Sequence, residues 1–270
     1  MARAAPVVMS SPLPRLSQKA RHAQILALLR RDGVVRIATL AQTFDVTTET
    51  ARRDLDALAA TGALQRTYGG GANRSLIDEP GIRQRGLAHP SARSRIAAAA
   101  AGLVEAGDAL LIDAGSTTSL FAAALAARNL HLTVVTNCVP VATALGAADR
   151  CRVILCPGEL VPREAGVFGS ETVAFLARYR ANKAFIGAGG VSPDGVTDAD
   201  SAACAVKRTM LERAERALLL ADSSKFGTVQ FERFATLADV DDLVTEAPAP
   251  RKLDAALKGA GVTVRLALRA

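Results

Sequence analysis

VTTETARRDLDALAATGALQRTYGGG, residues 46–71, is the stretch that decides the fold of the front of this chain. Val46, Ala51, Leu55 and Leu58 recur at helical spacing, so one face of the segment is apolar. The opposite face is polar and carries Thr48, Glu49, Thr50, Arg52, Arg53 and Asp56. The pattern predicts an amphipathic helix that begins after an N-cap at Thr47.

A shorter amphipathic helix precedes this one, and only a tight corner at residues 45–47 separates the two. Its apolar positions are Ile37, Leu40, Ala41 and Phe44. Two short helices joined in this way form a helix-turn-helix, whose second helix enters the major groove of DNA. After it, residues 63–67 predict a strand and residues 68–71 a flexible glycine-rich tip, as in a winged variant.

Charge supports DNA binding over the alternative of an ordinary helical domain with a solvated face. Residues 1–74 hold 11 Lys and Arg against 5 Asp and Glu, whereas residues 75–270 hold 22 against 21. Such a local basic surplus matches the phosphate backbone, and Arg side chains can fork onto guanine edges. We predict a DNA-binding domain over residues 17–72, with contacts from Arg36, Thr47, Thr48, Glu49, Thr50, Arg52, Arg53, Arg66 and Tyr68.

The pattern changes after residues 73–91, where prolines, glycines and charges predict a linker. Short apolar runs then alternate with helical segments. Strands are predicted at 109–113, 131–136, 151–156, 183–187 and 216–221, and helices at 92–105, 118–127, 138–147, 170–179 and 201–214. This order predicts a Rossmann-like, mostly parallel α/β domain over residues 92–250, followed by a helix and a strand in residues 251–270.

Polar and glycine-rich turns follow four of these strands, at the edge where open α/β sheets bind ligands. They are DAGSTT at 113–118, TN at 136–137, GAGG at 187–190 and DSSKFG at 222–227. Backbone amides and hydroxyls at the start of a helix suit a phosphate. Each turn alone can be a helix cap or a tight turn, but together they predict a small phosphorylated ligand, with Gly189 among its contacts and Lys225 and Lys207 as candidate cations.

Other ligand classes fit the sequence less well. The GAGG segment lacks the third glycine of a dinucleotide fingerprint, so we expect no cofactor. Cys138, Cys151, Cys156 and Cys204 form no CxxC pair, and the three histidines are scattered, so we expect no metal site. No apolar run reaches the roughly 18 residues of a membrane span, which makes the cytoplasm the expected location.

Over residues 17–250 the chain resembles the DeoR family of bacterial transcriptional regulators. The resemblance is carried by RRDL at 52–55 with the glycines at 69–71, and by GDALLIDAGSTT, the TN pair, FIGAGGV and ADSSKFG. It implies a winged helix-turn-helix joined to a sensor similar to ribose-5-phosphate isomerase. It also implies homo-oligomers assembled through the sensor, and repression of a sugar or related carbon operon that a phosphorylated sugar relieves.

The resemblance implies DNA contacts from residues 48–53 and ligand contacts from a set of turn residues. That set is Asp113, Gly115, Ser116, Thr117, Thr118, Asn137, Gly187 and Lys225. Three positions depart from the family pattern: Tyr68 replaces a common His, Ala51 a usual Ile, and Gly189 a frequent acidic residue. Two alternatives to a non-enzymatic regulator stay open, an isomerase-like enzyme with Asp198 or Asp200 as base and a structural DNA-bridging protein.

Overall fold

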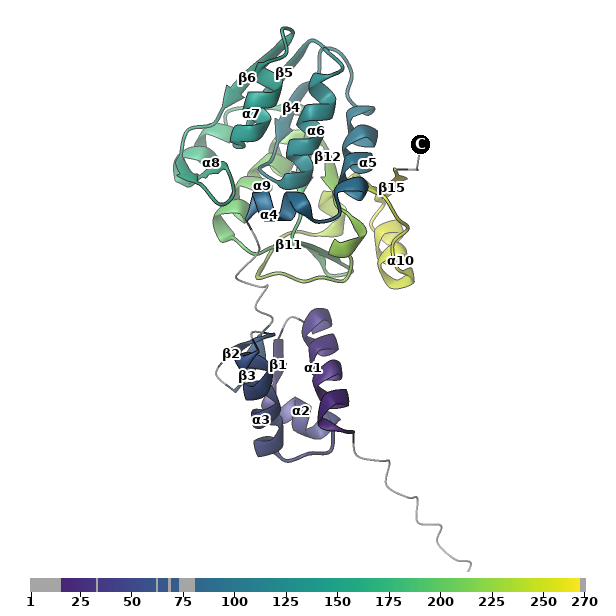
Figure 1. The fold of residues 1–270 in the computed structure, drawn as a ribbon. Helices are drawn as coiled ribbons and strands as arrows, with labels where there is room; N and C mark the ends of the chain where they lie inside the picture. The colour runs from purple at the N-terminus through teal and green to yellow at the C-terminus, as the bar shows by residue number, and fades with distance from the viewer. Residues whose placement is uncertain (1–15, 33, 62, 68, 73–80, 268–270) are drawn as a thin grey trace, which may run out of the picture. The chain divides into compact units, whose positions relative to one another are not determined.

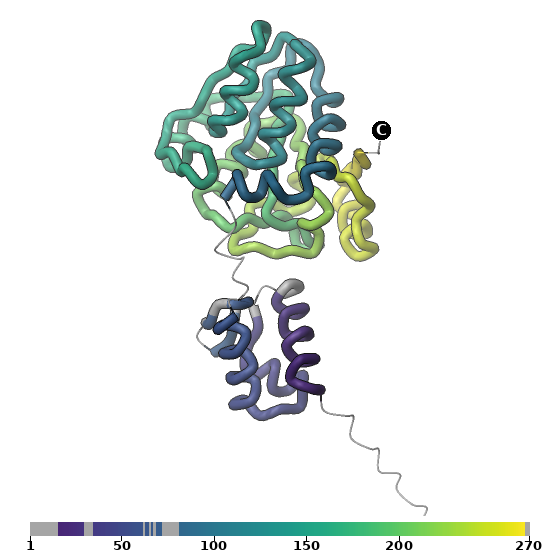
Figure 2. Tube along the Cα trace, in the orientation of Figure 1, coloured from purple at the N-terminus to yellow at the C-terminus, as the bar shows by residue number. Residues whose placement is uncertain are grey.

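The computed structural model describes residues 16–267 apart from 33, 62, 68 and 73–80. The chain divides into two compact units, residues 1–74 and 75–270. Figures 1 and 2 trace both units.

The first unit is a small helical domain with a three-stranded wing. Its elements are α1 (Gln18–Asp32), β1 (Val34–Arg36), α2 (Ile37–Thr43), α3 (Thr48–Ala60), β2 (Gln65–Thr67) and β3 (Gly70–Ala72). Ile25, Leu40 and Leu55 are almost completely buried where the three helices meet. The backbone amide of Thr50 donates to Thr47 Oγ1 at 3.1 Å, so Thr47 caps α3 as the sequence predicts.

The wing differs from the prediction in one respect. Residues 70–71 were expected in a flexible tip, but they belong to β3, which pairs antiparallel with both β2 and β1. Gly70 lies so close to β1 that a Cβ atom there would be 2.0 Å from the carbonyl oxygen of Val35. Glycine is needed for this approach of two strands, so the glycines build the wing rather than loosen it.

The second unit is an α/β domain around a seven-stranded parallel sheet in the order β15-β14-β12-β9-β4-β5-β6. Its strands are β4 (Ala109–Ile112), β5 (Leu132–Thr136), β6 (Cys151–Leu155), β9 (Ala181–Gly187), β12 (Ala214–Leu220), β14 (Asp242–Thr245) and β15 (Thr263–Leu266). The predicted parallel sheet is therefore confirmed. The expected C-terminal strand, β15, forms one edge of this sheet and β6 the other (Figure 1).

Helices cover both faces of the sheet, which explains why the strands are apolar at successive positions. Leu110 and Ile112 pack in one cluster with α5 (Pro90–Ala101), α6 (Ser116–Ala126) and α7 (Val139–Gly146). These three helices lie side by side in Figure 1. Leu111 points into the opposite cluster with α8 (Ser170–Leu176), α9 (Ser201–Arg213) and α10 (Arg251–Gly259). Phe121 and Phe185 stack across the first interface at 4.2 Å between ring centroids.

Shorter elements lie outside the seven-stranded sheet. They are α4 (Ile82–Leu87), β7 (Glu159–Val161), β8 (Gly166–Phe168), β10 (Gly190–Ser192), β11 (Gly195–Asp198), β13 (Glu232–Ala235) and two 3-10 turns, η2 (Ser223–Lys225) and η3 (Leu237–Asp239). The antiparallel pairs of β7 with β8 and β10 with β11 were not predicted. Part of the expected linker, residues 82–87, is helix α4, and its Ile82 is buried.

Candidate functional site

A pocket opens at the carboxyl ends of β4, β9 and β12, where the predicted turns converge. Its walls include Ala114 to Thr117 after β4, Gly187 and Ala188 after β9, and Asp222 and Lys225 after β12. Leu220, the last residue of β12, also lines the pocket. Residues from outside the sheet close its sides, namely Arg85, Arg93, Arg163, Glu164, Phe168, Asp198, Ala199, Asp200, Ala203 and Lys207. The parallel topology therefore brings distant turns to one cavity, as the sequence predicts.

One side of the pocket carries hydrogen-bond donors at the start of a helix. Helix α6 begins there, and its N-cap is Gly115, which has no side chain to cap the first amides. The hydroxyls of Ser116 and Thr117 line the cavity at this helix start. Uncapped amides, the positive end of the helix dipole and two hydroxyls are the groups that bind a phosphate.

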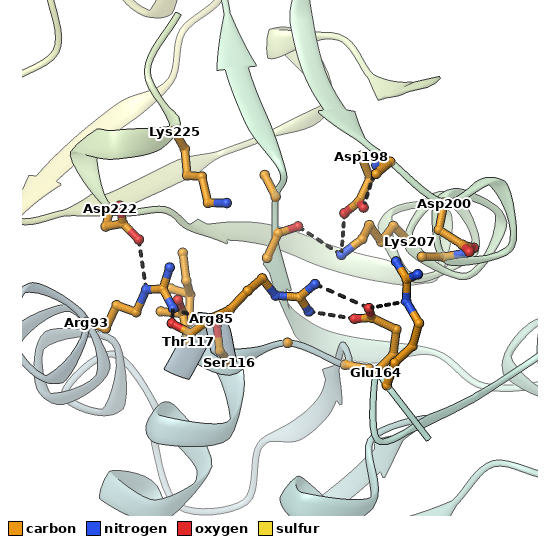
Figure 3. A pocket seen from close by; sticks show the side chains of 18 of the residues that line it. Arg85, Arg93, Ser116, Thr117, Glu164, Asp198, Asp200, Lys207, Asp222 and Lys225 are labelled. Atoms are coloured by element: carbon orange, nitrogen blue, oxygen red, sulfur yellow. Dashed lines mark hydrogen bonds and ion pairs between the residues drawn. The ribbon is translucent and has the colours of Figure 1, made fainter. Parts of the chain in front are cut away.

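Arg93 ties residues 114–117 to two other segments. Its Nε donates to Asp222 Oδ2 at 2.9 Å, and its Nη1 donates to Ser116 Oγ at 2.9 Å and to the backbone carbonyl of Arg85. Burial alone raises the pKa of Asp222, but hydrogen bonds from Ser224 and Arg93 outweigh it and hold this pKa below its ordinary value. The side chain of Arg93 is only 4% exposed, so the pocket wall contains a fixed positive charge. Figure 3 shows the pair of Arg93 and Asp222 beside Ser116.

Lys207 is the second buried cation, and it lies at the opposite side of the pocket (Figure 3). Its Nζ donates to Asp113 Oδ2 and, at 3.0 Å, to the carbonyl of Gly187, and it lies 3.4 Å from Asp198 Oδ2. Burial alone lowers the pKa of Lys207, but the charges of Asp113 and Asp198 outweigh this and hold its pKa above the ordinary value. Lys207 therefore stays protonated and joins the ends of β4, β9 and β11.

Six of the ten predicted ligand residues line this pocket: Gly115, Ser116, Thr117, Gly187, Lys207 and Lys225. The other four lie behind its lining. Asp113, Thr118 and Asn137 are fully buried, and the Asn137 side chain holds the loop by accepting from the amide of Ala114 at 3.0 Å and donating to the carbonyl of Val167 at 3.1 Å. Gly189 packs against Gln230 and Asp198 so tightly that a Cβ would be 2.8 Å from Gln230 Cγ.

Sequence reasoning missed the arginines of the pocket. Arg85 and Arg93 lie on α4 and α5, which precede the first strand of the sheet, so no turn at a strand end marks them. Glu164 lies in the connection between β7 and β8, a hairpin that was not predicted. The only signal in the sequence is that these charged residues flank apolar helix positions, a feature shared with most solvated side chains.

In the first unit, helix α3 presents the predicted polar face to solvent. Arg52 and Arg53 have side chains 57% and 78% exposed, and Glu49 lies within 3.6 Å and 3.4 Å of them. Thr47, Thr48 and Arg36 are exposed and Thr50 is half-buried. Arg66 on β2 pairs with Asp56 at 2.8 Å, next to the wing. Tyr68 lies outside the described residues. The exposed face thus carries guanidiniums and hydroxyls suited to phosphates and base edges.

Within the described residues, no helix combines the length and apolar character needed to cross a membrane. In the same part of the chain, no group of three or more His, Cys, Asp or Glu side chains is arranged to hold a metal ion.

Comparison with known families matches both units. Residues 88–247 match the DeoR C terminal sensor domain, and residues 21–75 match the DeoR-like helix-turn-helix domain. This chain belongs to the DeoR family. As a DeoR-family protein it is a DNA-binding transcriptional regulator and not an enzyme, which resolves the alternative of an isomerase-like activity.

Relatives of this DeoR-family chain match over most of its length. The Glycerol-3-phosphate regulon repressor of Escherichia coli (strain K12) is 32% identical over 236 residues, which are 87% of this chain and 93% of that protein. The HTH-type transcriptional repressor CsqR of the same strain is 30% identical over 94% of this chain and 97% of its own. Among solved structures, ribose 5-phosphate isomerase A from Methanocaldococcus jannaschii aligns with 52% of this chain and 55% of its own at 17% identity and a TM-score of 0.39.

Proposed function

We propose that this protein represses an operon for sugar or related carbon catabolism and leaves its operator when a small phosphorylated sugar binds the sensor. The observation that carries the proposal is the composition of the pocket. The start of α6, with Ser116 and Thr117, lies beside the buried cation Arg93. This half of the pocket suits a phosphate, because amides, hydroxyls and a guanidinium all donate hydrogen bonds to an anion.

The other half of the pocket suits a polyhydroxylated body. Asp198 and Asp200 line it opposite the α6 start, with Lys207 between the carboxylate of Asp198 and that of Asp113. Carboxylates accept hydrogen bonds from hydroxyl groups but repel a second phosphate. The pocket therefore favours a ligand with one phosphate and several hydroxyls over a bisphosphate. The relative named a glycerol-3-phosphate regulon repressor points to the same chemical class.

DNA recognition is assigned to the exposed face of α3 and to the wing. The proposed contacts are Arg36, Thr47, Thr48, Glu49, Thr50, Arg52, Arg53, Arg66 and Tyr68. We infer that the protein acts as a homo-oligomer, in which two such units bind two half-sites of one operator. A sugar phosphate releases the DNA only if it binds the DNA-free arrangement more tightly than the DNA-bound one.

The test combines a ligand panel with a matched pair of variants. Thermal unfolding of the full-length chain is measured with glycerol 3-phosphate, ribose 5-phosphate, fructose 1-phosphate and their unphosphorylated counterparts, because a specific ligand raises the melting temperature. Thr117→Val, which removes a hydroxyl from the pocket, is expected to weaken binding by about tenfold or more. Thr143→Val, at an exposed position of α7, is the control.

The same ligands are then added to a complex of the protein with a duplex selected by the protein from a random library. A compound that stabilises the protein should also release this duplex, measured by fluorescence anisotropy at fixed salt. If no phosphorylated compound in the panel stabilises the chain, or if stabilising compounds leave the duplex bound, the proposed function is wrong.

A further inference from the structure

Helix α4 is attached to the rim of the pocket by a pair of charges from distant parts of the chain. Arg85 on α4 meets Glu164, in the connection between β7 and β8, through two contacts: Nη2 to Oε2 at 2.6 Å and Nη1 to Oε1 at 3.3 Å. The amide of Ile82 adds a hydrogen bond of 2.8 Å to the carbonyl of Arg163 in the same connection. Together these contacts hold α4 against residues 162–165.

Both charges of this pair face the cavity. Arg85 and Glu164 line the pocket, and their side chains are only 12% and 14% exposed. Figure 3 shows Arg85 reaching across the pocket to Glu164, between the side that holds Arg93 and the side that holds Lys207. An anion that enters the pocket therefore approaches a guanidinium whose present partner is a carboxylate.

Arg93 links this pair to the proposed phosphate loop. The same nitrogen, Nη1, donates to Ser116 Oγ in the loop and to the backbone carbonyl of Arg85. A phosphate at Ser116 competes for that nitrogen, because an anionic oxygen is a stronger acceptor than a carbonyl. One ligand would thus weaken two attachments of α4, the one through the Arg85 side chain and the one through the Arg85 backbone.

The exchange leaves no buried charge without a partner. Glu164 also lies 3.4 Å from Arg163 Nε, and the Arg163 side chain is 50% exposed. After Arg85 turns to the ligand, Glu164 keeps a cation at the solvent side. Every charge is therefore paired both before and after Arg85 changes partner, so the two states can have similar free energies. A ligand that binds one state more tightly can then shift the equilibrium between them.

We propose that the ion pair of Arg85 and Glu164 is a latch that a phosphorylated ligand opens by taking over the Arg85 guanidinium. The proposal rests on the proposed function, since it gives the same pocket its route of regulation. Helix α4 is the first described helix or strand after β3 of the DNA-binding unit, and residues 73–81 lie between these two elements along the chain. Opening the latch frees the part of the sensor to which the DNA-binding unit is covalently joined.

The test follows hydrogen–deuterium exchange of the full-length chain with glycerol 3-phosphate and, as a minimal anion, inorganic phosphate. In the unmodified protein, glycerol 3-phosphate is expected to slow exchange at residues 113–119 and to speed exchange at residues 82–88. Slower exchange at 113–119 with no change at 82–88 overturns the latch and leaves the proposed function standing. If neither anion, nor any other phosphorylated compound of the thermal-unfolding panel, changes exchange at 113–119, both the latch and the proposed function fail.

Variants at the two ends of the latch should change affinity in opposite directions. Glu164→Gln removes the carboxylate that competes with the ligand, so glycerol 3-phosphate should bind about fivefold more tightly, measured by calorimetry. Arg85→Gln removes a charged donor to the ligand, so binding should weaken by about tenfold. Either variant should speed exchange at residues 82–88 without any ligand. A change of affinity in the same direction for both variants contradicts the latch.

Asp200→Asn is the matched control for the loss of one negative charge. Asp200 lines the same pocket, and Asn can keep its role as the N-cap of α9, where it accepts from the amide of Ala203 at 2.9 Å. This variant should leave exchange at residues 82–88 as in the unmodified protein. If Asp200→Asn speeds exchange at residues 82–88 as much as Glu164→Gln does, the faster exchange results from the loss of any negative charge in the pocket, and the latch is refuted.

Discussion

Asp54 shows how one buried carboxylate can fix the first unit while neighbouring side chains of the same helix face solvent. It is buried on α3, and it accepts from Arg21 Nε at 2.7 Å, from Arg21 Nη2 at 3.1 Å and contacts His22 Nε2 at 3.0 Å, all across to α1. Burial alone raises the pKa of Asp54, but the hydrogen bonds from Arg21 and His22 outweigh it, so the pKa lies below its ordinary value. The neighbouring Arg53 side chain is 78% exposed.

A carboxylate with a depressed pKa stabilises the fold above its unfolded pKa of about 3.9, and that stability is lost as the pH falls through the folded pKa. Asp54→Asn should therefore destabilise the first unit by about 2 kcal/mol at neutral pH, and the difference should shrink below pH 4. Scanning calorimetry of the full-length chain from pH 7 to pH 3 checks this. The control is Asp56→Asn, whose side chain is 55% exposed. Equal effects of both variants at every pH would contradict the assignment.

The helical spacing of apolar residues was enough to predict which face of α3 is buried and which is exposed, because successive residues are related by a fixed rotation about the helix axis. It did not reveal the partner of Asp54, since Arg21 lies 33 positions earlier and on another helix. The same limit applies to the pocket. Ser116 and Thr117 could be predicted because they follow a strand, whereas Arg93 contacts Ser116 only through the packing of α5 against α6.

Among the elements, the wing depends on the contact between β3 and β1. Strands of three residues are too short to show a period, so neither β1 nor β3 was predicted, although β2 was. Long apolar runs such as β9 and β12 were located to within two residues of the observed ends, because a strand buried on both faces needs continuous apolar side chains.

Gly70→Ala is expected to break the wing, because its Cβ would be 2.0 Å from the Val35 carbonyl oxygen and one strand must move away. A loss of about 1–3 kcal/mol in stability is expected, together with weaker binding to the selected duplex in an anisotropy titration. Gly69→Ala is the comparison: its φ is +76°, and a Cβ there meets nothing within 4 Å. It should cost only about 1 kcal/mol of backbone strain. Identical losses in the two variants would argue against the packed wing.

Across the complete chain, positive charge is concentrated where DNA binding is proposed. Residues 1–74 carry 11 basic and 5 acidic side chains, against 22 and 21 in residues 75–270. Affinity for DNA should fall linearly with salt on logarithmic axes, because bound counterions are released from the phosphates. Arg52→Ala should weaken binding and reduce the magnitude of this slope by about one if Arg52 contacts a phosphate.

The matched control is Arg251→Ala, which removes an exposed arginine from the second unit. Both variants are titrated onto the same duplex by anisotropy between 50 and 300 mM salt. An unchanged slope and affinity for Arg52→Ala, or an equal loss for Arg251→Ala, would show that the α3 face is not the contact surface.

The strand order of the second unit has a consequence for how the protein is made. Strands β4, β5 and β6 are the first strands of the seven-stranded sheet to leave the ribosome. Strand β9, which pairs with β4 on the side opposite β5, follows about 70 residues later. During that interval the nascent sheet exposes an unpaired inner edge of Leu110 to Ile112, the kind of surface that attracts other chains and chaperones. The DNA-binding unit has been synthesised by then, so translation produces this unit before it completes the sensor domain that is proposed to regulate it.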